Sequence, residues 1–167
     1  MDALFAQAEA LAAVLKARRQ TVAVAESSTG GLISAALLSV AGASAYYLGG
    51  GVVYTPRARH RLLDLKREDV RGLKSASEPY AALLAETVRR RFSANWGISE
   101  TGASGPNGNP YGDAAGHSCL AVAGAGAVTI ARTLETGSSD RLGNMVAFAQ
   151  AALSLLLAQV EAQPAVG

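Results

Sequence analysis

The stretch AESSTGG, residues 25–31, gathers a carboxylate, three hydroxyl groups and two glycines at one point of the chain. It follows the apolar run TVAVA (21–25), typical of a buried strand, and precedes the helical pattern LISAALLSV (32–40). Ligands of α/β sheets bind where strands end, and free N–H groups at a helix start favour anions. Two interpretations follow: Ser28 or Thr29 merely caps the helix, or the turn binds a phosphate or carboxylate through Ser28, Thr29, Gly30 and Gly31.

A second candidate is TGASGPNGNPYGDAAG, residues 101–116, which is dense in Gly, Pro, Asn and Asp and is predicted to be a long loop. Loops of this length in compact domains are commonly functional, although an exposed loop is an equal alternative. Its glycines permit close backbone approach to a ligand. Candidate binding residues here are Thr101, Gly102, Gly105 and Gly116, with Ser104 and Asn107 as further hydrogen-bonding groups.

A serine nucleophile needs a base within hydrogen-bonding reach. The chain has two histidines, of which His60 lies among arginines on a predicted helix and His117 begins a strand beside the long loop. There is no GxSxG elbow and no metal-ligand spacing, and Cys119 is the only cysteine. We therefore expect no metal or other cofactor and no internal disulfide.

The elements that must position these residues alternate between helix and strand. Helices are predicted at 2–19, 32–40, 56–64 and from Ser77 onward, strands at 21–25, 45–55 and 96–100, then a hairpin at 117–135 and a closing helix capped by Ser138 or Ser139. This order predicts an α/β fold, a three-layer α/β/α sandwich with a mixed sheet. We expect one domain over residues 1–160 and a frayed tail at 161–167.

Composition narrows the class of protein. The chain has 167 residues, a net charge of +2, 17% charged residues and 50% hydrophobic residues, which favours one well-packed globular domain. Aromatic residues do not interleave with the arginine runs, so we expect no nucleic-acid partner. No apolar run approaches the roughly 20 residues needed to cross a bilayer, and no signal peptide is predicted. We expect a cytoplasmic protein and, because such assemblies are common, a homodimer.

Taken together and in order, these motifs resemble one family, the CinA C-terminal domain or nicotinamide-nucleotide amidase family. The resemblance runs from AESSTGG through LGGGVVYT, SEPYAALLAETVRRR and TGASGP to GSSDR. It implies an α/β/α domain that hydrolyses nicotinamide mononucleotide to nicotinate mononucleotide and ammonia. It also implies a serine nucleophile, which is Ser27 here, and a phosphate contact from Arg141 in the family's Gly-Asp-Arg motif.

Three positions depart from the family pattern. Ser28 stands where the family usually has cysteine, and Asp113–Ala114–Ala115–Gly116 stands in place of Lys-Pro-Val-Gly. The family's catalytic lysine follows Tyr-Ser-Asn, but this chain has Tyr54–Thr55–Pro56 and then Arg59. A buried lysine can lose its proton near neutral pH, whereas arginine stays charged. Arg59 therefore cannot accept the proton of Ser27, although it could bind a phosphate or stabilise an oxyanion.

Two functions therefore remain open. In the first, Ser27 attacks an amide, Tyr54 or His117 serves as the base, and backbone N–H groups near Ser28–Gly31 or in the 101–106 loop hold the oxyanion. In the second, the same pocket binds a nucleotide-like small molecule without amide chemistry. A different hydrolase or a purely structural protein is a weaker third alternative.

Overall fold

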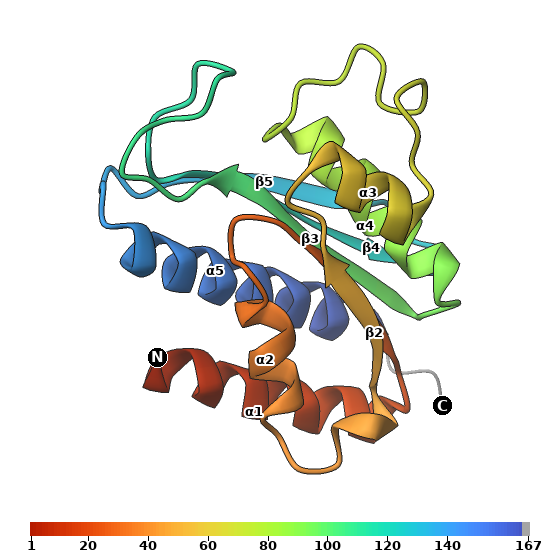
Figure 1. The fold of residues 1–167 in the computed structure, drawn as a ribbon. Coiled ribbons are helices and arrows are strands. Elements are labelled where there is room, and N and C mark those ends of the chain that lie inside the picture. The colour runs from red at the N-terminus through yellow and green to blue at the C-terminus, as the bar shows by residue number, and fades with distance from the viewer. Residues whose placement is uncertain (165–167) are drawn as a thin grey trace.

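The computed structural model describes residues 1–164, which form a five-stranded sheet between two layers of helices (Figure 1). The strands are β1 (Val22–Glu26), β2 (Tyr47–Val52), β3 (Trp96–Ala103), β4 (His117–Gly124) and β5 (Ile130–Glu135). Their order is β2-β1-β3-β4-β5. β1 pairs in parallel with β2 and β3, while β4 and β5 add antiparallel strands. The predicted mixed sheet and three-layer α/β/α sandwich are confirmed.

One layer holds α1 (Asp2–Arg18), α2 (Leu32–Leu38) and α5 (Arg141–Ala162), and the opposite layer holds α3 (Pro56–Leu63) and α4 (Glu78–Arg91) (Figure 1). A 3-10 turn, η1 (Ala43–Ala45), precedes β2. Side chains along β1 alternate between the two faces of the sheet and so contact both layers of helices. Val22 and Val24 pack with α1, α2 and α5, while Ala23 and Ala25 pack with α3 and α4. Every residue of β1 is buried, which accounts for its continuous apolar pattern.

Several predicted boundaries differ from the structure. β3 continues through Ala103, so the loop predicted from residue 101 begins at 104, and its first residues pair instead with β4. The N-cap of α5 is Asp140 rather than Ser138 or Ser139, and that of α2 is Gly31 rather than Ser28 or Thr29. α5 extends to Ala162, inside the tail predicted at 161–167, of which residues 165–167 lie outside the described residues.

The sequence analysis predicts no apolar run long enough to cross a membrane, yet the length and composition of α5 alone would allow it. Its packing gives the reason for this apolar character. Phe148, Ala152, Leu153 and Leu156 are at most 1% exposed, and they belong to the core cluster shared with α1, α2 and the sheet. We therefore interpret α5 as a core helix.

Candidate active site

The turn after β1 is built on two buried carboxylates. Glu26 accepts hydrogen bonds from the N–H groups of Gly31, Ile33 and Ser34 at the start of α2, and from the hydroxyls of Thr29 and Ser34. The predicted anion at this helix start is thus the chain's own carboxylate. Gly31 has φ +103°, a conformation that suits glycine and lets the chain curl back over Glu26.

Glu100, on β3, supports the same turn from below. One of its oxygens accepts from the N–H groups of Ser27 and Thr29, and the other accepts from the hydroxyls of Ser28 and Ser118. The Thr29 hydroxyl lies within hydrogen-bonding distance of both acids, 2.8 Å from Glu26 and 3.0 Å from Glu100, and shares its one proton between them. Burial raises the pKa of Glu100, and these hydrogen bonds from Ser28, Thr29 and Ser27 oppose the rise. The N–H groups of Ser27 and Thr29 both donate to Glu100, whereas the N–H of Ser28 between them has no acceptor among residues 1–164.

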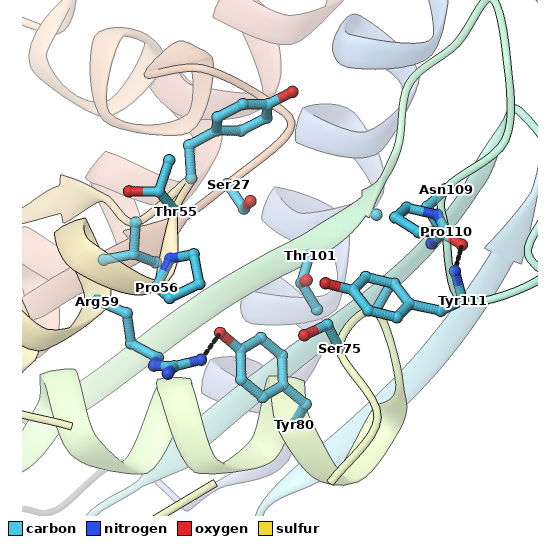
Figure 2. Close-up of a pocket in the computed structure, with 14 residues that line it drawn as sticks. Ser27, Thr55, Pro56, Arg59, Ser75, Tyr80, Thr101, Asn109, Pro110 and Tyr111 are labelled. Atoms are coloured by element: carbon cyan, nitrogen blue, oxygen red, sulfur yellow. Dashed lines mark hydrogen bonds between the residues drawn. The ribbon is translucent and has the colours of Figure 1, made fainter. Parts of the chain in front are cut away.

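Ser27 lies on the wall of a cleft of about 240 Å³ (Figure 2). The cleft lies between the carboxyl ends of β1 and β3, the start of α3 and the long loop. Its other polar side chains come from five separate segments: Tyr54, Thr55, Arg59, Ser75, Tyr80, Thr101, Asn109 and Tyr111. The structure thus brings the predicted residues Ser27, Tyr54, Arg59, Thr101 and Gly102 into one cavity.

A second depression of about 190 Å³ adjoins the first and shares Tyr54, Gly102, Asn109 and Pro110 with it. Its lining includes the predicted residues Ser28, Gly105 and Arg141. Arg141 donates a hydrogen bond to the carbonyl of Gly105, which fixes the arginine beside the loop. The glycine at 102 has a packing reason, since a Cβ there would lie 2.4 Å from the carbonyl oxygen of His117.

Four predicted residues do not line either cavity among the described residues. Thr29 is fully buried between Glu26 and Glu100, Gly30 is exposed on the turn, and Gly31 donates its N–H to Glu26. Gly116 sits at the base of the long loop, where its N–H donates to Ala103 and its carbonyl accepts from Thr136. These residues shape the turn and the loop rather than face the cavity.

Arg59 is the floor of the cleft (Figure 2). Thr55 caps α3 by accepting from the N–H of Ala58, and Pro56 opens the helix, so Arg59 projects from its first turns. The side chain is 8% exposed and makes one long hydrogen bond, 3.4 Å, from Nη1 to the hydroxyl of Tyr80. Its Nε is buried without a partner, and the described ion pairs do not include it. Tyr80 was not anticipated as a site residue, because nothing in its helical pattern distinguishes it from a core residue.

His117 is occupied elsewhere. Its Nδ1 contacts Glu135 and its Nε2 lies 2.7 Å from the carbonyl of Ala76, so neither ring nitrogen is available to Ser27. Burial lowers the pKa of His117, but hydrogen bonds to Glu135 and Ala76 and the charges of Glu135 and Asp113 outweigh it and leave the pKa raised. Of the two bases proposed for Ser27, Tyr54 is the one that lines the cleft.

The long loop is held by Asp113, the residue that departs in charge from the family pattern. Lys74 pairs with Asp113 at 2.8 Å, which offsets the new negative charge. Burial acts to raise the pKa of Asp113, but hydrogen bonds from Lys74 and Asn109 outweigh it, so the pKa is lowered. The Asn109 side chain also accepts from the N–H of Tyr111, which holds Tyr111 over the cleft (Figure 2).

Comparisons with known proteins agree with this architecture. A CinA-like protein of Desulforapulum autotrophicum is 36% identical over 86% of this chain, and one of Anaeromyxobacter sp. strain K is 40% identical over 89%. The chain spans about a third of the length of these curated relatives (34% and 36%).

Among solved structures, the competence/damage inducible protein CihA of Agrobacterium tumefaciens superposes with a TM-score of 0.86 at 28% identity, covering 93% of this chain and 94% of that one. A competence or damage-inducible protein of Enterobacter asburiae gives 0.86 at 29% identity, covering 94% of this chain and 98% of that one. The family model of the CinA C-terminal domain matches residues 5–160. The chain therefore belongs to the CinA C-terminal domain family.

Proposed function

We propose that this domain binds nicotinamide mononucleotide, or a closely related nucleotide amide, and hydrolyses its carboxamide with Ser27 as the nucleophile. The observation that carries the proposal is the placement of Ser27 at the end of β1, in a cleft, with the acceptor-free Ser28 N–H next to it. A backbone N–H after the nucleophile is a common oxyanion donor in acyl transfer. Family membership supports an activity of this class, and Arg141 would contact the phosphate from the adjoining depression.

The proposed reaction needs no strong base, because one hydroxyl can relay the proton. Ser27 Oγ attacks the carboxamide carbon while its proton passes to the hydroxyl oxygen of Tyr54. Tyr54 gives its own proton to the departing nitrogen, which leaves as ammonia. Water then attacks the Ser27 ester by the reverse relay, releasing the carboxylic acid and restoring the serine hydroxyl.

A second candidate is a domain that binds the nucleotide without cleaving it, and Arg59 favours it. An arginine side chain cannot accept the serine proton as the family's lysine is thought to do. The described residues also give the Ser27 hydroxyl no hydrogen-bond partner. This candidate keeps the same ligand and the same cleft.

Ammonia release from nicotinamide mononucleotide separates the two candidates. The assay compares the unaltered protein with Ser27→Ala, Arg59→Lys and, as a control, the outward-facing Arg57→Lys on the same helix. Activity of the unaltered protein that Ser27→Ala abolishes would establish the amidase. Activity only in Arg59→Lys would establish the binding domain, and silence in all four proteins would contradict the proposed substrate.

A further inference from the structure

A third depression, of about 880 Å³, lies beside the Ser27 cleft and is also lined by Arg59. Three arginines line it, Arg59, Arg67 and Arg71, and its lining includes no acidic side chain from the part of the chain that the structure describes. It shares Pro56, Arg59 and Tyr111 with the cleft, so the two cavities adjoin each other. We call it the arginine depression.

Arg59 is the strongest indication that this depression takes an anion. A buried guanidinium normally pairs with a carboxylate and satisfies its five N–H donors, because an unpaired buried charge is costly. Arg59 is 92% buried, yet within residues 1–164 its side chain forms a single hydrogen bond, of 3.4 Å to Tyr80, and its buried Nε has no partner. Within residues 1–164 the chain does not supply the missing anion.

Arg67 and Arg71 add to this charge from the turns between α3 and α4. Both are exposed, and neither forms an ion pair with a carboxylate of the described residues. Nearby apolar side chains, Val70 and Leu73, wall the depression on the same segment. Three guanidinium groups around one hollow suit the several oxygens of a phosphate, which arginine binds in a bidentate manner.

We infer that the arginine depression is a phosphoryl-binding site, distinct from Arg141, for a small phosphorylated ligand that extends from the Ser27 cleft. Arg141 lies in the depression that adjoins the cleft through Tyr54 and Gly102, whereas the arginine depression adjoins it through Pro56, Arg59 and Tyr111. A ligand with phosphoryl groups at two separate positions, such as a nucleoside bisphosphate, fits this arrangement better than a singly phosphorylated one. The inference does not depend on Ser27 acting as a nucleophile.

Binding of inorganic pyrophosphate, measured by titration calorimetry, tests this site directly. The test variant is Arg67→Gln/Arg71→Gln, and the control is Arg57→Gln/Arg61→Gln, which removes the same charge from exposed positions of α3 outside the depression. We expect the test variant to weaken pyrophosphate binding about tenfold or more, and the control about twofold, because charge-assisted contacts are lost only in the first. Arg59→Met should weaken binding to a similar extent.

The site would be overturned if the two double variants weakened pyrophosphate binding equally, or if the unaltered protein did not bind pyrophosphate at millimolar concentration. It would also be overturned if a single-stranded oligonucleotide, at equal phosphate concentration, bound more tightly than pyrophosphate and displaced it. That result would indicate a nucleic-acid surface. The pyrophosphate titration does not depend on ammonia release, so its result stands even if the proposed amidase activity is absent. Conversely, Arg67→Gln/Arg71→Gln leaves every residue that lines the Ser27 cleft in place, so loss of pyrophosphate binding in this variant does not decide the ammonia assay.

Discussion

Buried ionisable side chains occur in two places around the cleft, and the two places differ in how completely their hydrogen bonds are satisfied. Glu26 and Glu100 are fully buried beneath the Ser27 turn. Each accepts four hydrogen bonds from its own backbone or hydroxyl donors, and the two acids share the Thr29 hydroxyl as a further donor. Arg59 is almost as buried and has one long bond. A buried group whose hydrogen bonds are complete holds the fold, whereas one with open donors is ready for a ligand. The comparison assigns the acids to structure and the arginine to binding.

The largest effect that this comparison predicts is at Glu26. In Glu26→Gln the new NH₂ group faces a backbone N–H in either orientation of the amide. The reason is that Gly31 and Ile33 donate to one carboxylate oxygen and Ser34 donates to the other. Backbone donors cannot turn away, so an N–H to N–H repulsion is unavoidable. We expect the free energy of unfolding to fall by about 3 kcal/mol, as when a buried charged acceptor is lost. Chemical denaturation measures it, and a loss below about 1 kcal/mol would contradict the assignment.

Glu100→Gln is the matched substitution, and its expected effect is smaller. The amide oxygen can keep the bonds from Ser27, Thr29 N and the Thr29 hydroxyl, while the new NH₂ faces the Ser28 and Ser118 hydroxyls, which can rotate to accept. We expect a change within about 1 kcal/mol at neutral pH.

The pH dependence of stability sharpens the Glu100 prediction. Because burial raises the pKa of Glu100 above its ordinary value of 4.5, the folded state holds the proton more tightly than the unfolded chain does. This group therefore contributes most stability below pH 4.5 and loses it as the pH rises toward the folded pKa. Denaturation midpoints across that range should show a decline that Glu100→Gln removes. The same slope in both proteins would mean that another group titrates there.

The sequence alone predicts most of the sheet and its helices, because the apolar alternation of β1 and the helical stripes of α1 and α4 reflect burial directly. It misses what depends on distant partners. The sequence predicts that β3 ends at residue 100, because Thr101 and Gly102 begin a stretch with the composition of a loop. In the structure these two residues pair with Cys119 and Ser118 on β4.

The candidate site shows the same division. The family resemblance points to Ser27, Tyr54 and Arg59, and these three residues do line one cleft. Other contacts join separate elements and therefore produce no periodic pattern in the sequence. Glu100 accepts from the N–H groups of Ser27 and Thr29, and Arg59 donates to Tyr80. For the first of these contacts, the available signal is an acid, Glu100, within a strand that is buried almost throughout.

The smallest effect on stability is expected at Arg59. Arg59→Met keeps a long apolar side chain of similar length, and it removes one 3.4 Å hydrogen bond and a buried Nε that has no described partner. Removing a buried charge that lacks an ion pair relieves its desolvation cost, so the free energy of unfolding should stay within about 1 kcal/mol of the unaltered protein or rise. A loss of 3 kcal/mol or more, comparable to Glu26→Gln, would show that Arg59 supports the fold like the acids and would end the contrast between them.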